Sequence, residues 1–451
     1  MNPAQNDNAL LLALSGATVG NLDQLQATHG IYIRQTTGDL VLGNVNAGSG
    51  ADGVLQLAAT GSIYAESGFT DRTAVHVVAS ALDLRAGGGV GFNGATLQPL
   101  QVKISGAITG TAVGDMTILS PNSNMTVGAA GTYGVLTSGG ALTLDTIAGT
   151  IAINADVTSA GAMQLLANAA ITFADGTSAN PVVAQSTGGA ITLASASLNM
   201  GAYSALDAAG VLSVVTTGDV TLGQLRSAAS YAAAGNAASI VVQAGGVTTG
   251  NIFSNGDGSV NLVTTGAGAR LSMTANTIGT ASQRVTVSSQ SLAATASDGS
   301  IYLTAAPDMR ATLLSAVEGT VDVTGAASYT LDSVLASTAA GATGHFIAQT
   351  TGPGTLTVGT ATGRGTLRLL AADSVSFGSL TSLALAGDPG DVIVTAGDGA
   401  ILGGSITAYG GVTLTAGANL PVGSPLAANA KITGTGNIAS STFITLSARG
   451  Q

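Results

Sequence analysis

The sequence predicts an all-β fold, a right-handed parallel β-helix (β-solenoid) of about 20 residues per coil. Three observations predict it: a short phrase that recurs along the chain, a composition of small and β-branched residues, and the near absence of helical periodicity. Gly accounts for 65 of 451 residues and charged residues for only 8%, against about 25% in ordinary globular domains. Hydrophobic residues make up 45%, so the chain is too apolar to be disordered.

The recurring phrase begins with Gly, continues with a small or acidic residue, and then alternates apolar residues with Thr or Ser. A unit of this size cannot bury its apolar face alone, so it must stack on its neighbours. The irregular spacing argues against a left-handed hexapeptide helix, and no Gly-Gly-x-Gly-x-Asp nonapeptides of a calcium β-roll occur. The copies lie at Gly38–Gly43, Gly140–Leu144, Gly189–Leu193, Gly218–Gly223, Gly258–Leu262, Gly299–Leu303, Gly319–Val323, Gly354–Val358 and Gly410–Thr415.

Alternation within the phrase predicts which side chains face the core, because successive residues of a strand point to opposite sides. We expect the apolar positions to form inward stacks and the intervening Thr and Ser residues to face outward. The positions expected in the core are Leu142, Leu144, Ile191, Leu193, Val220, Leu222, Val260, Leu262, Ile301, Leu303, Val412 and Leu414.

Short apolar runs bounded by Gly, Asp, Asn and Ser predict further strands along the chain. We expect residues 1–451 to form one β-solenoid, with residues 1–28 as an N-terminal cap or entry segment. Irregular loops are expected near 226–238, where an Ala-rich stretch also allows a short outer helix, and near 419–430, which holds two prolines. The expected strands are Gly53–Leu57, Gly61–Tyr64, Val75–Ala79, Leu82–Arg85, Gln101–Ile104, Val214–Thr217, Ile240–Gln243, Val285–Ser288, Leu367–Leu370, Val375–Phe377 and Val392–Thr395.

Charge and cysteine content restrict the partners and the compartment. The net charge is −11 and only Lys103 and Lys431 join ten scattered Arg residues, so no basic patch for nucleic acid or an anionic membrane is expected. No run of about 20 apolar residues predicts a membrane span. The absence of Cys favours a chain exported unfolded. Leu10–Leu14 is too short for a signal sequence, so we expect an internal piece of a longer exported protein.

Longer blocks of the sequence share an order: an Ile-Gly turn, a Pro-Leu-x-Val strand, and then a Gly-x-Ile-Tyr strand. This order resembles the repeat regions of filamentous-haemagglutinin-like large exoproteins, adhesins of Gram-negative bacteria. The resemblance implies an extracellular or cell-surface location and a role in adhesion or biofilm formation. The blocks that carry it are Gly30–Ile33, Leu40–Val45 and Gly61–Ile63; Gly88–Gly91 and Pro99–Val102; and Ile278–Ala281, Arg284–Val287, Leu292 and Gly299–Leu303.

An enzyme that cleaves polysaccharides is an alternative, because such chemistry needs two or three carboxylates on one face with a matched base. The three histidines, His29, His76 and His345, have no acidic neighbours in sequence. The nearest clusters pair an acid with an Arg one or two residues later, and one coil places several of them on a common face. These positions are Asp71, Arg72, His76, Asp83 and Arg85. We favour outward solvated positions or local ion pairs, and expect no catalytic residue.

Calcium is a second candidate ligand, since Asp388, Asp391 and Asp398 fall within eleven residues and Asp257 and Asp298 lie in similar Asp-Gly turns. Ca²⁺ requires six to eight oxygen ligands, whereas Asp-Gly pairs are common in ordinary turns. We favour the turn interpretation and expect no cofactor or metal.

Outward threonines also raise the possibility of an ice-binding lattice. Thr355 with Thr357 and Thr413 with Thr415 are the clearest pairs. Their spacing along the chain is too irregular to predict a lattice match.

Taken together, these features predict a structural and adhesive segment of a secreted or surface-exposed bacterial exoprotein. We expect it to project or present a long polar surface to a cell-surface or polysaccharide ligand. The alternatives are a polysaccharide-cleaving β-helix enzyme, which requires a carboxylate cluster in a groove, and a self-assembling extracellular filament or matrix subunit, which requires uncapped ends.

Overall fold

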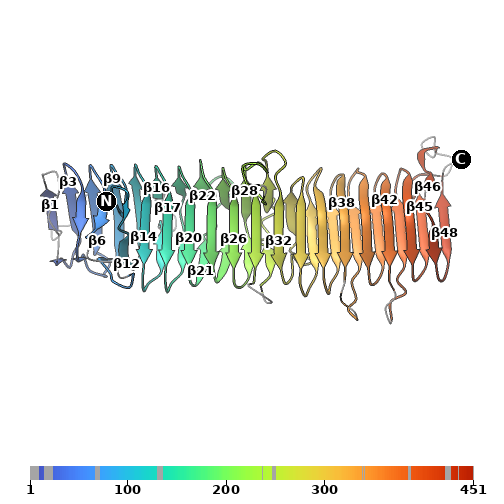
Figure 1. Ribbon diagram of the computed structural model, residues 1–451, viewed down its shortest axis with the longest axis horizontal. Coiled ribbons are helices and arrows are strands. Elements are labelled where there is room, and N and C mark those ends of the chain that lie inside the picture. Colours follow the sequence, from blue (N-terminus) through green and yellow to red (C-terminus); the bar gives the residue numbers. More distant parts are fainter. Residues whose placement is uncertain are drawn as a thin grey trace. The chain divides into compact units, whose positions relative to one another are not determined.

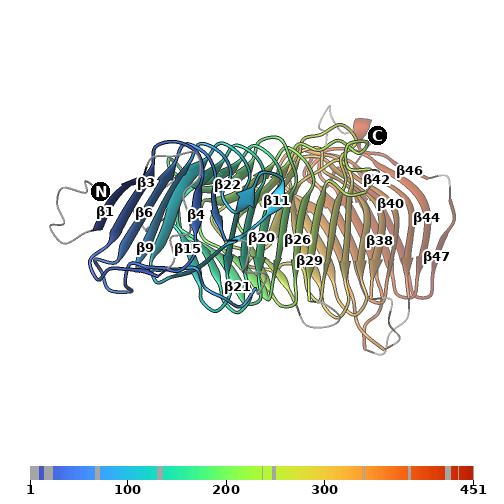
Figure 2. The same ribbon diagram turned by 60° about the vertical axis from the view of Figure 1, so that its left-hand side comes forward.

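The structure, a computed structural model, describes residues 10–14, 24–66, 72–128, 136–235, 237–245, 250–337, 339, 341–383, 387–421, 428–434 and 436–449. These residues form strands and turns without an α-helix; Ala428–Asn429 form a short 3₁₀ turn. The chain divides into two compact units, unit 1 (residues 1–216 and 225–228) and unit 2 (residues 217–224 and 229–451). Each unit is a parallel β-solenoid, as the sequence predicts (Figures 1 and 2).

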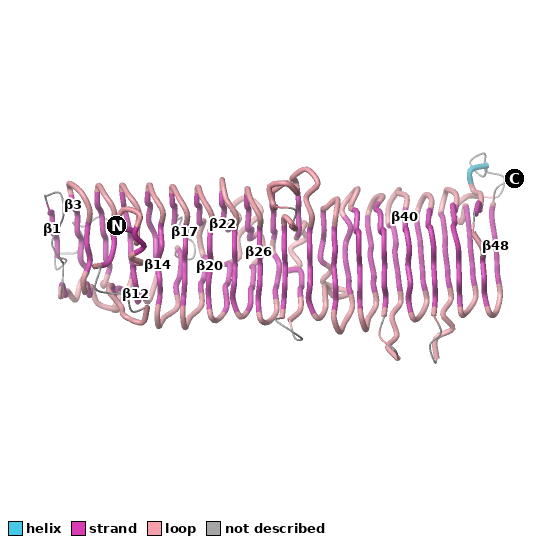
Figure 3. Tube along the Cα trace, in the orientation of Figure 1, coloured by secondary structure: helices cyan, strands magenta, loops and turns pink. Residues whose placement is uncertain are grey.

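Unit 1 is built from short strands, most of them three to six residues long, joined by tight turns (Figure 3). Its strands are β1 Leu10–Leu14, β2 Leu25–Gln26, β3 Ile31–Gln35, β4 Leu40–Leu42, β5 Val45–Asn46, β6 Val54–Ala59, β7 Ile63–Ala65, β8 Val77–Ala79, β9 Ala81–Ala86, β10 Phe92–Asn93, β11 Thr96–Leu97, β12 Leu100–Ile104, β13 Ala107–Ala112, β14 Met116–Ser120, β15 Met125–Val127, β16 Leu136–Ser138, β17 Leu142–Thr146, β18 Ile151–Ile153, β19 Val157–Ser159, β20 Met163–Ala167, β21 Ala170–Phe173, β22 Val182–Ser186, β23 Ile191–Ser195, β24 Ser197–Met200, β25 Ser204–Ala208, β26 Leu212–Thr216 and, from its second residue on, β28 Gln224–Ser227.

Unit 2 contains longer strands, several of which run for eight residues around a bend. Its strands are β27 Val220–Leu222, β29 Ile240–Ala244, β30 Ile252–Ser254, β31 Leu262–Thr264, β32 Leu271–Ala275, β33 Val285–Ser288, β34 Leu292–Ala296, β35 Ile301–Ala305, β36 Arg310–Ala316, β37 Val321–Gly325, β38 Tyr329–Ala336, β39 Phe346–Thr350, β40 Leu356–Gly363, β41 Leu367–Ala371, β42 Val375–Ser382, β43 Val392–Ala396, β44 Ile401–Ala408, β45 Val412–Ala416, β46 Ile432–Gly434, β47 Ile438–Ser440 and β48 Ile444–Ala448.

Apart from the antiparallel pair β10–β11, the strands of the coils pair in parallel with their equivalents one coil away, so equivalent residues stack in columns. In unit 2 the column that starts at Ile301 continues through Val321, Phe346 and Leu367, which follow at intervals of 20, 25 and 21 residues. All four side chains are fully buried. The shortest interval equals the period seen in the sequence, and the longer ones hold extra residues at the turns between strands.

The inward columns form the core of both units, and the Thr and Ser residues between them face outward. Eleven of the twelve positions predicted to be inward are at most 2% exposed. Burying each such aliphatic side chain contributes about 2 kcal/mol. Every strand range predicted from the sequence overlaps an observed strand.

Val260 is the exception: the prediction of an inward position there is wrong, because Val260 is half-exposed and the next residue, Asn261, is fully buried. The Asn261 amide donates to the carbonyl oxygens of Leu222 and Gly223 at 3.2 and 3.0 Å and accepts from the Thr286 backbone at 2.9 Å. These bonds satisfy the buried amide, so Asn261 and Leu262 are both buried and the alternation is broken just before Leu262, which keeps its inward position.

The acidic residue of the repeated phrase has a structural role at the turns. Asp115 Oδ1 accepts a hydrogen bond of 2.7 Å from the backbone N–H of Ala141 in the next coil, and Asp219 Oδ1 accepts one of 2.8 Å from Asn251. Where the phrase has Ser300 instead, its hydroxyl accepts the N–H of Thr320 at 3.0 Å. The same contact requires glycine at position 140, because a Cβ on Gly140 would collide with the Asp115 carboxylate.

The predicted loops and the predicted N-terminal segment have different boundaries in the structure. Residues 226 and 227 belong to strand β28, so the irregular loop of that region begins at Ala228. It is fastened by Arg270, whose guanidinium lies 4.0 Å from the centre of the Tyr231 ring. In the second loop the described residues lie outside strands, and residues 422–427 are outside the described part. Within residues 1–28, β1 already pairs in parallel with β3 and therefore forms part of a coil.

Candidate functional site

Two outward surfaces hold polar side chains that a ligand can reach, and each belongs to one unit. The first is a groove in unit 1 with a volume of about 700 Å³. The second is an array of hydroxyl groups on three long strands of unit 2. Both follow from the alternation of the strands, which sends every second side chain away from the core.

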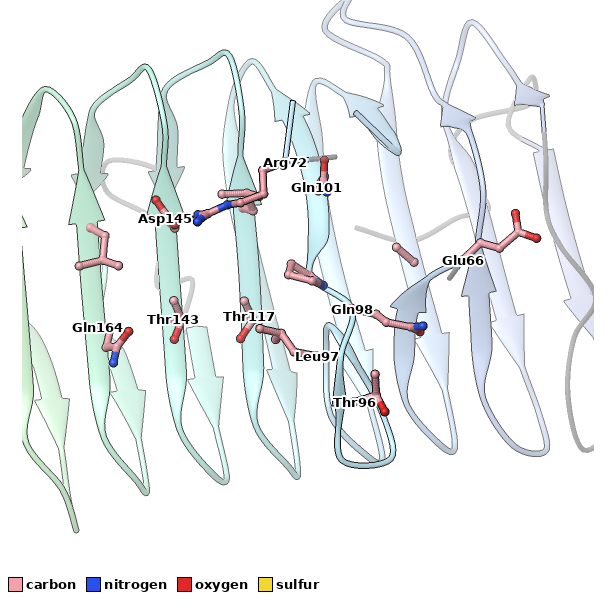
Figure 4. A pocket seen from close by; sticks show the side chains of 14 residues that line it. Glu66, Arg72, Thr96, Leu97, Gln98, Gln101, Thr117, Thr143, Asp145 and Gln164 are labelled. Atoms are coloured by element: carbon pink, nitrogen blue, oxygen red, sulfur yellow. Dashed lines mark hydrogen bonds and ion pairs between the residues drawn. The ribbon is translucent and has the colours of Figure 1, made fainter. Parts of the chain in front are cut away.

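The floor of the groove is the outward face of strands β17 and β20. Thr143 pairs in register with Gln164, and Asp145 pairs with Leu166, so these four side chains form two adjacent columns. Thr117 extends the first column onto strand β14. Figure 4 shows Thr117, Thr143 and Gln164 in a row across three successive strands.

One wall of the groove is an insertion that the repeated phrase does not contain. The antiparallel hairpin β10–β11 and the segment that follows it contribute Thr96, Leu97, Gln98 and Pro99 to the lining. On strand β14 all five residues are buried, including the outward positions, which differs from the alternating pattern of β17. The insertion therefore adds a second layer over β14 and leaves a step beside β17.

An ion pair joins two distant segments across the groove. Arg72, from the chain between β7 and β8, donates from Nη2 to Oδ2 of Asp145 on strand β17. The Arg72 side chain is mostly exposed, whereas that of Asp145 is largely covered. Glu66 also lines the groove and lies at the opposite end of the labelled set from Gln164 (Figure 4).

The second surface, which we call the hydroxyl face, lies on strands β40, β42 and β44. Its side chains are stacked in register from strand to strand, so hydroxyl groups recur every ~4.8 Å in two columns across all three strands. The third column holds Thr357 and Ser376 and ends at the exposed Leu402 on β44. None of these three strands contains a charged residue. The hydroxyl face consists of Thr357, Thr360, Thr362, Ser376, Ser379, Thr381, Ser405 and Thr407.

Bends in these strands depend on glycine. At the bend, Gly359, Gly378 and Gly404 occupy equivalent places on successive strands. A Cβ on Gly378 would lie 2.6 Å from the carbonyl oxygen of Gly359, and one on Gly404 would collide with the carbonyl of Gly378. Without side chains at this position the coils can approach to normal hydrogen-bonding distance, which keeps the hydroxyl face in register.

The cluster of Arg72, His76, Asp83 and Arg85 does not share one face, so that possibility is corrected. Arg72 lines the groove, while Asp83 and Arg85 form their own ion pair of 3.3 Å on strand β9 and line a different pocket. His76 is buried, and its Nδ1 accepts the backbone N–H of Gln101 at 3.3 Å. Burial lowers the pKa of His76 to about 4. Asp71 lies outside the described residues.

The remaining histidines are also separate from the groove. The exposed His29 lies 2.8 Å through Nδ1 from the hydroxyl of its neighbour Thr28. His345 Nδ1 accepts the backbone N–H of Thr366 at 3.2 Å and lies 3.6 Å from Asp388 Oδ2.

The three aspartates considered for calcium have different partners. Asp391 Oδ1 accepts the N–H of Gly411 at 2.6 Å, as the other acidic residues of the phrase do. Asp388 Oδ1 accepts the N–H of Gly390 at 2.8 Å within its own turn, and Asp398 is exposed. Within the described ranges, no three His, Asp or Glu side chains lie close enough together to hold a metal ion.

The threonine pairs considered for a lattice are outward but belong to different surfaces. Thr357 is part of the hydroxyl face, whereas Thr413 and Thr415 lie on β45, in the other sheet of unit 2. The part of the chain that the structure describes holds no helix long and apolar enough to cross a membrane.

Sequence reasoning missed the groove because its parts come from three separate segments. The available signal was the break in the phrase between residues 66 and 99, where Asn93-Gly94 marks a hairpin turn. The pairing of Arg72 with Asp145 joins residues 73 positions apart and could be identified only in the structure.

Comparison of the chain with family models, with curated proteins and with solved structures finds no match to any of the three.

Proposed function

We propose that the chain is a structural and adhesive segment of a secreted or surface-exposed bacterial exoprotein. It presents the hydroxyl face to a polysaccharide or a cell surface and catalyses no reaction there. The resemblance of the repeat blocks to filamentous-haemagglutinin-like exoproteins and the acidic, cysteine-free composition support an extracellular place.

The observation that carries this proposal is the regular, uncharged hydroxyl face. Two columns of Thr and Ser hydroxyls run in register over β40, β42 and β44, and a third column holds Thr357 and Ser376 before it reaches Leu402 on β44. Such groups exchange hydrogen bonds with the hydroxyls of a sugar polymer, and each bond contributes only about 1 kcal/mol. Repetition along the stack converts weak contacts into avidity for an extended ligand.

Charge placed on the hydroxyl face tests the proposal. In the full chain, Thr362→Glu, Thr381→Glu and Thr407→Glu together put three carboxylates on one column. We expect adsorption to polysaccharide-coated surfaces and to bacterial cells to fall at least tenfold, because the ligand must then desolvate charged groups. Single and double variants should lose adsorption in steps.

A matched control uses another outward column of unit 2. Thr286→Glu, Thr304→Glu and Thr324→Glu are also three consecutive residues in register, on strands β33, β35 and β37. Adsorption should stay within twofold of the parent chain. Equal losses in both triple variants, or no loss in the first, would refute the hydroxyl face as the adhesive surface.

A further inference from the structure

We propose that the groove of unit 1 is a discrete binding site for a short, neutral oligosaccharide. This site is separate from the hydroxyl face of unit 2, and the proposal does not depend on adhesion through that face. Four features carry it: the shape of the groove, its hydrogen-bonding groups, its apolar patches and its charge.

The shape fits an extended ligand. The volume of about 700 Å³ lies within the range of small-molecule sites, which is about 300–1,000 Å³. Polar side chains follow one another on neighbouring strands, as Thr143 and Gln164 do in Figure 4, and Thr117 continues their column at its buried end on β14. A chain of linked sugar rings lying along this row meets Thr143 and Gln164 on adjacent coils, about 4.8 Å apart.

The hydrogen-bonding groups are those that recognise vicinal hydroxyls. Gln164 offers an amide with both donor and acceptor atoms, and the Arg72–Asp145 pair offers a guanidinium beside a carboxylate. Gln98 provides a further amide whose Oε1 is buried and accepts no hydrogen bond from the described residues. A buried acceptor without a hydrogen bond costs free energy, so a hydrogen bond between the Gln98 amide and a ligand hydroxyl would be favourable.

Apolar side chains beside these groups suit the C–H faces of sugar rings. Leu166 lies next to Asp145 on the floor, and Leu97 and Pro99 form the facing wall. Leu97 is 56% exposed, although it sits on a hairpin that covers other residues. A large apolar side chain exposed at the edge of a polar groove is typical of a surface that a ligand covers.

Charge favours a neutral ligand over an acidic one. Among the described residues, the ionisable groups that line the groove are two acids, Glu66 and Asp145, and one base, Arg72. A uronic acid would therefore bring its carboxylate toward more acidic than basic groups, in a chain whose overall net charge is −11.

The arrangement supports binding rather than cleavage. Hydrolysis of a glycosidic bond uses two carboxyl groups that flank the scissile bond. In the groove Asp145 is held by Arg72, and Glu66 lies toward the other end, beyond Gln98 (Figure 4). The groove therefore presents these two carboxyl groups as separate contacts along the ligand.

Titration of the full chain with defined sugars tests the site. The neutral probes are cello-, laminari-, malto- and mannohexaose, and the acidic probe is hexagalacturonate, followed by calorimetry and by reducing-end assay. We expect at least one neutral probe to bind without cleavage, and Arg72→Gln and Gln164→Ala each to weaken that binding about tenfold.

Two matched variants control for general effects. Arg310→Gln breaks another exposed Arg–Asp pair, the 2.8 Å contact with Asp332 in unit 2. Thr192→Ala alters the next residue of the Gln164 column, which lies outside the groove. Both should bind the neutral probe as the parent chain does.

The outcomes separate this proposal from the adhesive one. Failure of every neutral probe to bind, tighter binding of hexagalacturonate, release of reducing ends, or equal losses in the control variants would each overturn it. Adsorption through the hydroxyl face is measured with a different set of variants, so either proposal can fail while the other stands.

Discussion

Each of the two units has a core of stacked aliphatic side chains, but the units differ in what lies on their outer sheets. In unit 1 the hairpin β10–β11 covers the outward side chains of β14, and the step at its edge forms the groove. In unit 2 strands β40, β42 and β44 carry no such cover and present the hydroxyl face. The comparison indicates that the repeated phrase determines the solenoid, whereas insertions that depart from the phrase form discrete sites.

A charge in the core should produce the largest effect in either unit. Leu193 in unit 1 and Leu414 in unit 2 occupy inward columns and are at most 2% exposed. Leu193→Asp and Leu414→Asp should each destabilise the affected unit by more than about 4 kcal/mol, because the carboxylate is buried without a partner. Hydrogen exchange followed by mass spectrometry reports the loss of protection in each unit separately.

The control for this prediction is the last described strand. Leu446 on β48 pairs in register with Leu414 but is 55% exposed. Leu446→Asp should therefore cost less than about 1 kcal/mol. A loss as large as that of Leu414→Asp would show that stability does not follow burial in this fold.

The glycine bend should distinguish unit 2 from unit 1. Gly404→Ala places a Cβ against the Gly378 carbonyl, so unit 2 should lose about 3 kcal/mol while unit 1 keeps its protection. Gly434→Ala is the control, since its Cβ would meet the nearest atom at an ordinary 3.4 Å. Thermal unfolding and hydrogen exchange measure both variants, and comparable losses in both would contradict the role of the bend.

Buried His76 should make unit 1 sensitive to pH in a way that unit 2 is not. Its pKa falls from 6.5 to about 4 on folding, because burial disfavours the charged ring. Between these values the unfolded chain binds more protons, so stability is complete above pH 6.5 and falls as the pH drops toward 4. The loss should be on the order of 3 kcal/mol.

Variants at two histidines check this assignment. His76→Gln should flatten the dependence of unfolding free energy on pH between 4 and 6.5. His345→Gln, a substitution in unit 2, should leave the slope measured for unit 1 unchanged because it alters the other unit. If the slope persists in His76→Gln, another group must be responsible for it.

Much of this fold follows from the sequence because the core depends on local alternation. Leu142, Ile191 and Ile301 could be placed inward from their position in the phrase alone. The position of Val260 could not be predicted in this way, because the neighbouring Asn261 is buried and is stabilised by backbone groups in neighbouring coils. The groove escaped prediction for the same reason: the contact between Arg72 and Asp145 depends on how an insertion lies over the coils, which periodicity does not encode.

The capping aspartates should contribute equally in the two units. Asp115 accepts the N–H of Ala141 at 2.7 Å, and Asp391 accepts the N–H of Gly411 at 2.6 Å. Asp115→Ala and Asp391→Ala should each destabilise the affected unit by about 1.5–3 kcal/mol, the usual contribution of a hydrogen bond to a charged acceptor. Thermal melts measure the stability of both variants. Asp398→Ala, at an exposed aspartate, should leave the melting temperature unchanged. A strong asymmetry between the two units would indicate a further role for one aspartate.

The smallest expected effect concerns calcium at the turns of unit 2. Asp388, Asp391 and Asp398 contact Gly390, Gly411 and solvent respectively, so their carboxylates do not converge. An ion that bound only the folded chain would raise the free energy of unfolding by RT ln(1 + [L]/Kd), and the melting temperature would rise with it. We expect melts with millimolar Ca²⁺ and with EDTA to coincide within about 1 °C, in the parent chain and in Asp388→Ala alike. A calcium-dependent rise that Asp388→Ala abolishes would instead identify these turns as a metal site of unit 2.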